Sequence, residues 1–206
     1  MKLYFQFILL ILLTSFQNTK TLTRLTNVSQ YRDEFGFDIR YASSNNFIGE
    51  RMYDCPLCLL QPEVAEALRD ANDYFCYLGY RIKIFDCYRP LSVQKKMWEK
   101  VPRATYVANP YKKGSIHNRA AAVDITLETL DGCPVYMGTD YDYFGREAHI
   151  DYFNFPQYII DNRKLLQEGM KKFGFQTIRT EWWHFSYKKN YKYPVLNIPF
   201  PCEESN

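Results

Sequence analysis

The sequence predicts a single α+β domain in which an antiparallel sheet is flanked by helices. Segments with apolar residues at helical spacing are interspersed with short segments in which polar and apolar residues alternate. No repeat, low-complexity linker or break in composition divides the 206-residue chain. Hydrophobic residues make up 47% and aromatic residues 17% of the sequence, which is enough for one compact core.

The first half of the chain contains two expected strands and two expected helices. Residues 37–41 alternate like a short strand, and residues 81–85 alternate like a half-buried one. Between them, a helix opens at Pro62, repeats apolar residues at helical spacing and ends before Gly79. A second helix starts at Pro90 and runs to about residue 100.

The second half is expected to contain longer loops between its elements. Residues 101–114 and 128–150 have the composition of loops and turns. A small, apolar and β-branched strand is expected at 120–127. A helix follows at 161–172, and an aromatic strand at 181–187 completes the predicted domain.

The charge balance excludes one class of partner. Twenty-six basic residues face 23 acidic ones, a net charge of +3, which gives no electrostatic basis for binding nucleic acid. The chain holds only three histidines, His117, His149 and His184. Any site built on imidazole must therefore draw on these three.

The N-terminus has the pattern of a secretory signal. Lys2 precedes an apolar run at residues 3–13, and small and polar residues follow. We therefore expect a signal peptide at about residues 1–17 and a mature domain at 18–206, exported to the periplasm or secreted. The run is shorter than the ~20 apolar residues that span a bilayer, so stable membrane insertion after signal removal is not expected. An uncleaved anchor is the less favoured alternative.

The six cysteines indicate disulfides, because an exported chain reaches an oxidising compartment. Their pairing cannot be chosen from the sequence. Cys55 and Cys58 have the C-x-x-C spacing of redox and zinc sites, but no second C-x-x-C or nearby histidine completes a zinc set. A structural disulfide role is favoured over both alternatives.

Two short segments each combine a carboxylate with an imidazole. His117 and Asp124 flank the start of the strand expected at 120–127, and an ionised Asp124 in this apolar strand requires compensating partners. Glu181 and His184 lie three residues apart among aromatic residues. Together the two segments supply N, O and N ligands for a hydrolytic zinc site with an open fourth position, and one further carboxylate.

The motif S-x-H-x-x-A-x-A-x-D at 115–124, followed by E-W-W-H at 181–184, resembles the VanX-like zinc D-alanyl-D-alanine dipeptidases. These belong to the zinc D,D-peptidases, which are related to the hedgehog amino-terminal fold. Further likeness, including the segment at 83–90, extends the resemblance over about residues 37 to 187. The sequence departs from the family pattern at Ala120, where the family has glycine.

The resemblance implies a role for each site residue. His117, Asp124 and His184 would bind one Zn²⁺ per chain, and Glu181 would be the general base and acid. Arg89 would stabilise the tetrahedral intermediate. The candidates for holding the substrate ammonium are Ser115 and Asp142, with a turn-capping role as the alternative. Asp86 would either orient Arg89 or line the site, and His149 is expected to be structural rather than a ligand.

The favoured function is hydrolysis of the small dipeptide D-Ala-D-Ala. One alternative keeps the chemistry but changes the substrate, in a D,D- or L,D-carboxypeptidase that trims peptidoglycan stem peptides. Another is a zinc-stabilised binding module without catalysis, against which the presence of both Glu181 and Arg89 argues. The sequence leaves the oligomeric state open.

Overall fold

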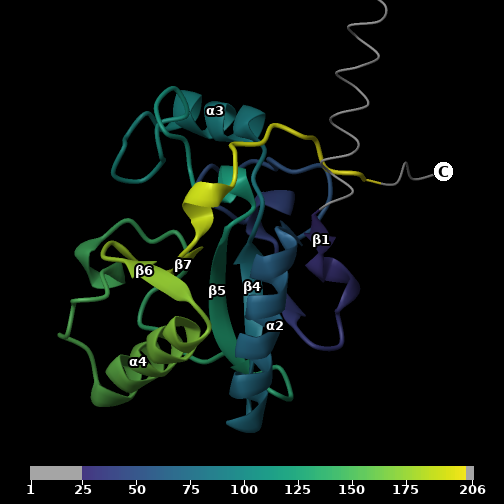
Figure 1. Cartoon of the computed structure of the whole chain (residues 1–206). Coiled ribbons are helices and arrows are strands. Elements are labelled where there is room, and N and C mark those ends of the chain that lie inside the picture. Colours follow the sequence, from purple (N-terminus) through teal and green to yellow (C-terminus); the bar gives the residue numbers. More distant parts are fainter. Residues whose placement is uncertain (1–24, 203–206) are drawn as a thin grey trace, which may run out of the picture.

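The computed structural model describes residues 25–202, and a five-stranded sheet is its central element (Figure 1). In spatial order the strands are β2 (Gly36–Phe37), β4 (Tyr80–Asp86), β5 (Ala122–Thr129), β7 (Glu181–Tyr187) and β6 (Phe175–Ile178). β2 runs parallel to β4, and the other neighbours are antiparallel. A small antiparallel sheet joins β1 (Thr26–Asn27) to β3 (Leu59–Leu60). The predicted α+β domain is confirmed, with one parallel pair added.

Three α-helices accompany the sheet in the described part of the chain. They are α2 (Pro62–Tyr77), α3 (Leu91–Lys100) and α4 (Gln157–Lys172). α2 packs against β4, α4 packs against β6, and the two helices contact each other, so they cover one face of the sheet (Figure 1). Short 3₁₀ helices occur at Val28–Gln30, Arg40–Ala42, His117–Arg119, Arg146–Ala148 and Asn190–Lys192.

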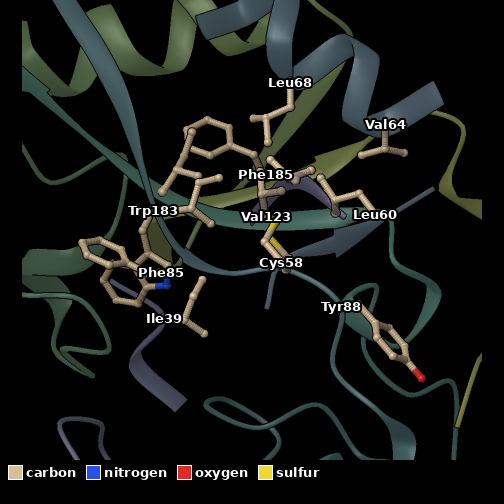
Figure 2. Packing of buried hydrophobic residues seen from close by; sticks show 14 of the residues in the cluster. Ile39, Cys58, Leu60, Val64, Leu68, Phe85, Tyr88, Val123, Trp183 and Phe185 are labelled. Carbon is tan, nitrogen blue, oxygen red and sulfur yellow. A yellow bond between two sulfur atoms is a disulfide. The ribbon is translucent and has the colours of Figure 1, made fainter. Parts of the chain in front are cut away.

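The core lies between the sheet and these helices. Figure 2 shows Val123 of β5 and Phe185 of β7 beside Leu68 of α2. Successive side chains of a strand point to opposite faces, so the neighbouring residues Asp124 and His184 face away from α2. The sheet thus separates an apolar face under the helices from a face that carries polar groups.

Most of the elements expected from the sequence are present. The helices at 62–77 and 91–100 and the strands at 80–86 and 181–187 are confirmed. α4 begins at Gln157, directly after Pro156, and therefore earlier than expected. The strand expected at 37–41 is wrong beyond Phe37, because a 3₁₀ helix starts at Arg40. The short strand β6 was not predicted.

Four of the six cysteines form disulfides. Cys55 is bonded to Cys202, and Cys58 is bonded to Cys87, so the two cysteines of C-x-x-C have separate and distant partners. The expected disulfide framework is confirmed for these four. It is wrong for Cys76 and Cys133, which carry free thiols.

The signal peptide expected at 1–17 lies outside the described residues. Between Leu25 and Cys202, none of the helices combines the length and the apolar character that a membrane crossing requires.

One carboxylate connects the start of α2 to the chain that follows the site strand β7. Glu63 accepts hydrogen bonds from the Tyr187 hydroxyl at 3.0 Å, the Lys189 ammonium at 2.9 Å and the Tyr193 hydroxyl at 3.0 Å. These donors, Lys189 first, lower the pKa of Glu63 to about 2. The carboxylate therefore holds residues 187–193 against the helix only while it is ionised.

We expect Glu63→Gln to lower the melting temperature at pH 7. The pKa of Glu63 in the folded chain, about 2, lies below its ordinary value of 4.5. Its stabilisation is therefore complete above pH 4.5 and is lost as the pH falls through about 2. Thermal unfolding followed by circular dichroism should show the two proteins converging over this range. Glu66→Gln, the same charge change on the exposed side of α2, is the control and should have a smaller effect.

Candidate metal centre and active site

The sheet register places two of the predicted site residues side by side. Asp124 of β5 is paired with His184 of β7, and Asp86 at the end of β4 is paired with Asp124 from the other side. His117 lies in the 3₁₀ turn that leads into β5, and its backbone carbonyl accepts a hydrogen bond from the Arg89 amide at 3.1 Å. Three segments distant in sequence therefore meet at one edge of the polar face.

Three side-chain atoms converge at this point. Asp124 Oδ1 lies 3.2 Å from His117 Nε2 and 3.0 Å from His184 Nδ1, and the two ring nitrogens are 3.2 Å apart. Ligands about 2.0–2.1 Å from a tetrahedral zinc ion lie ~3.3 Å from one another. The spacing of the three atoms and their N, O and N chemistry therefore fit one zinc ion with a fourth position left open.

Each of these side chains is fixed by a second contact. His117 Nδ1 lies 2.7 Å from the Cys87 carbonyl oxygen, to which it donates, so Nε2 keeps its lone pair. His184 Nε2 lies 2.9 Å from the Ser186 hydroxyl. The Tyr141 hydroxyl donates to Asp124 Oδ2 at 2.9 Å. Such outer partners orient metal ligands and hold the correct tautomer.

Asp124 remains ionised although it is buried. Burial raises the pKa of this carboxyl, but the adjacent His117 and His184 outweigh burial and hold its pKa well below the usual value. The requirement for compensating partners, expected from the apolar sequence around Asp124, is therefore met by the two imidazoles.

Glu181 lies beside this cluster without joining it. Its Oε2 is 3.9 Å from His184 Nδ1, and 21% of its side chain is exposed. Burial, opposed in part by His184, raises the pKa of Glu181 to about 7. A carboxyl group with a pKa near neutrality can both accept and release a proton during a reaction.

Arg89 is held in one orientation by two side chains. Its Nη2 donates to Asp86 Oδ2 at 2.6 Å and its Nη1 to Gln94 Oε1 at 3.0 Å. Burial opposes the charge, but the Asp86 carboxylate and the neighbouring Tyr53 outweigh burial and raise the pKa of Arg89. Its buried Nε has no hydrogen-bond partner among residues 25–202. Asp86 thus orients Arg89, one of the two roles expected from the sequence.

One cavity of about 280 Å³, here called the site cavity, is lined by all seven predicted site residues. These are Arg89, Ser115, His117, Asp124, Asp142, Glu181 and His184. Ser115 also accepts a hydrogen bond from the His117 amide at 3.2 Å, so it caps the turn as well. Asp142 Oδ2 accepts from the Tyr41 hydroxyl at 2.9 Å.

The sequence did not single out several residues that complete the site. Tyr141, Ser186 and Gln94 contact the predicted residues directly, but common polar residues carry no signal of such a contact. Trp183 lines the site cavity and packs against Tyr141. His149 is not part of the cluster and lines a neighbouring cavity.

The matching family and the similar relatives agree with one another. The family Peptidase M15, described as D-ala-D-ala dipeptidase, matches residues 21–205. D-alanyl-D-alanine dipeptidase of Escherichia coli strain K12 is 31% identical over 180 residues, which are 87% of this chain and 93% of the relative. The protein of the same name from Enterococcus faecalis is 29% identical over 185 residues, and the match covers 80% of this chain and 88% of that relative.

Solved structures show a weaker likeness. The vancomycin-resistance D,D-pentapeptidase VanY in complex with Zn(II) has 17% identity and a TM-score of 0.43, covering 64% of this chain and 74% of that one. The LdcB LD-carboxypeptidase has 20% identity and a TM-score of 0.42, covering 65% and 62%.

We expect Asp124→Asn and His184→Ala to weaken binding of a divalent metal by more than roughly 100-fold, because the first removes the negative charge of the carboxylate and the second removes a converging nitrogen. His149→Ala removes an imidazole outside the cluster and should leave metal affinity unchanged. Competition with a chromogenic chelator measures the affinity, and circular dichroism of the metal-free variants checks that they fold. An equal loss of metal in His149→Ala would contradict the assignment.

Proposed function

This chain belongs to the Peptidase M15 family of D-ala-D-ala dipeptidases, and we propose that it hydrolyses D-alanyl-D-alanine to two molecules of D-alanine with one bound zinc ion. It is a metallopeptidase. The observation that carries the proposal is the convergence of three ligand atoms beside Glu181 and Arg89 in one cavity. This arrangement also favours an enzyme over a zinc-stabilised binding module.

In this proposal His117, Asp124 and His184 hold the zinc ion. When bound, zinc supplies polarisation of the scissile carbonyl and lowers the pKa of a water molecule towards ~7. Glu181 takes a proton from the attacking water and delivers it to the leaving amine nitrogen as the C–N bond breaks. The position of Glu181 next to the ligands and its pKa of about 7 support both halves of this transfer.

Arg89 stabilises the negative charge that develops on the carbonyl oxygen. Arg89 lines the site cavity, and Asp86 and Gln94 fix the plane of its guanidinium. A donor that is already oriented requires no rearrangement when the charge appears, and loss of one such donor typically costs ~10²- to 10³-fold in rate.

The substrate ammonium is assigned to Asp142, with Ser115 as a further polar contact. Burial raises the pKa of Asp142 well above its usual value, so its charge is costly in the free protein. A bound ammonium would compensate for that charge and be held by it. The site cavity, about 280 Å³ in volume, is at the small end of ligand clefts, which start at roughly 300 Å³.

Purified protein loaded with zinc should release D-alanine from D-Ala-D-Ala, and a metal chelator should abolish the activity. An assay of free D-alanine measures both, with a stem peptide ending in D-Ala-D-Ala as the competing substrate. Absence of turnover by zinc-loaded enzyme would refute the proposed function. Faster cleavage of the stem peptide would favour the carboxypeptidase alternative.

Glu181→Ala separates catalysis from metal binding in the same assay. We expect it to abolish turnover while leaving the zinc content nearly intact, because Glu181 lies outside the three converging atoms. Loss of zinc equal to that in His184→Ala would show that Glu181 is a ligand instead.

The enzyme is further proposed to act outside the cytoplasm, either in the periplasm or as a secreted protein. The apolar N-terminal run and the two disulfides support export, since disulfides persist in oxidising compartments. An exported dipeptidase would meet its substrate during cell-wall recycling or in the use of D-alanine as a nutrient.

Export predicts that cell fractionation finds the protein outside the cytosol, with a mature N-terminus near residue 18 by mass spectrometry. The apolar segment is too short to span a bilayer, and the mature protein no longer carries it. The mature protein should therefore not remain attached to the membrane. Detection only in the cytosolic fraction, with residues 1–17 retained, would contradict this proposal.

A further inference from the structure

A second cavity, of about 460 Å³, adjoins the site cavity. Thr105, Tyr106, Thr180 and Glu181 line both cavities. The two cavities are therefore neighbours, and Glu181 lies where they meet.

The two cavities differ in charge. Among the residues that line the site cavity, Arg89 is the one arginine or lysine and is paired with Asp86, whereas three carboxyl groups are present. The second cavity is lined by Arg146, Arg179 and His149, with Glu181 as its one acid. We call it the basic cavity.

The basic side chains have donors to spare. Arg146 takes part in none of the ion pairs found between residues 25 and 202. Arg179 uses Nε for Asp151 at 2.7 Å, which leaves the rest of its planar fork of donors for a carboxylate. The buried Nδ1 of His149 has no hydrogen-bond partner among the described residues and lies 4.0 Å from Asp151.

The chemistry of the proposed reaction fixes the direction of the substrate. Glu181 delivers a proton to the nitrogen of the leaving residue, so this residue must lie against Glu181. The carboxylate of the leaving residue is separated from that nitrogen by a single carbon atom. The opposite end of the dipeptide carries the ammonium assigned to Asp142, which lines the site cavity and not the basic one.

We propose that the basic cavity binds the C-terminal carboxylate of the substrate, with Arg146 and Arg179 as its counter-charges. This inference rests on the proposed function and deepens it. The ammonium of the dipeptide then lies against Asp142 in the site cavity, and its carboxylate lies against the arginines of the basic cavity. Binding at both ends places the scissile bond between the ligand cluster and Glu181. A free carboxylate becomes a requirement for tight substrate binding, so the enzyme discriminates against dipeptides whose C-terminus is blocked.

The test compares D-Ala-D-Ala with its C-terminal amide on the zinc-loaded enzyme. The variants are Arg146→Gln, Arg179→Gln and the double variant. For D-Ala-D-Ala, the free acid, we expect the double variant to raise KM about tenfold, or ~1.4 kcal/mol. The kcat should change by less than about twofold, because the interaction is made equally in the ground state and the transition state. For the amide, KM should be the same in the native and double-variant enzymes.

Arg69→Gln is the matched control for Arg179→Gln, because Arg69 is likewise an exposed arginine paired with one carboxylate, that of Glu34. It should leave both kinetic constants unchanged. The charge-conserving pair Arg146→Lys and Arg179→Lys should restore most of the binding of the acid.

Two outcomes overturn the inference and can be told apart. In the first, the native enzyme turns over D-Ala-D-Ala while the KM of the double variant is unchanged, or rises equally for D-Ala-D-Ala and its amide. This result refutes the carboxylate site alone. A native enzyme without turnover of either substrate refutes the proposed function, and the carboxylate site with it.

Discussion

The site depends on one buried charge, the carboxylate of Asp124 in the middle of the sheet. An ionised carboxylate removed from water costs several kcal/mol unless its surroundings compensate. Here two imidazoles lie at 3.0 and 3.2 Å from one oxygen, and the Tyr141 hydroxyl donates to the other. The contacts that compensate the charge of Asp124 also bring the two imidazole nitrogens and the carboxylate oxygen together, so one set of interactions supports both β5 and the candidate metal centre.

The end of β4 orients both His117 of the candidate metal centre and Arg89. The Cys87 carbonyl orients His117, and the preceding residue, Asp86, orients Arg89. Asp86 also accepts from the buried Tyr53 hydroxyl at 2.7 Å, and Cys87 is bonded to Cys58. Displacement of this short segment would therefore move His117 and Arg89 together, and a disulfide, an ion pair and a buried tyrosine all hold it in place.

The sequence predicted the side chains of the site better than the backbone contacts and disulfides that hold them in position. Asp124 and His184 were identifiable because a carboxylate in an apolar strand and a histidine beside a glutamate are chemically unusual. The Cys87 carbonyl was not, since a backbone group leaves no trace in residue type. The pairing of the cysteines depends on contacts over 29 and 147 residues and is likewise invisible in local spacing.

The same reasoning explains the errors in the predicted elements. β6 has only the four residues Phe175–Ile178, too short a run for alternation to be distinguished from a loop, and it is stabilised by pairing with β7. The early start of α4 had a usable signal, because Pro156 directly precedes its first residue. At residues 40–42 the chain leaves the sheet, since β2 pairs with β4 only through Gly36 and Phe37.

Ala120 shows how the structure accommodates a departure from the family pattern. It has a φ of 53°, in the left-handed region, where an L-residue costs about 1–2 kcal/mol more than glycine. Its amide donates to the His117 carbonyl and its carbonyl accepts from the Gln61 amide at 2.9 Å, so both backbone groups are paired despite the strain. A disulfide that closes 29 residues, such as Cys58–Cys87, contributes roughly 3–4 kcal/mol in the chain-entropy account. This contribution to folding exceeds the strain at Ala120, so the folded chain tolerates a left-handed alanine at this position.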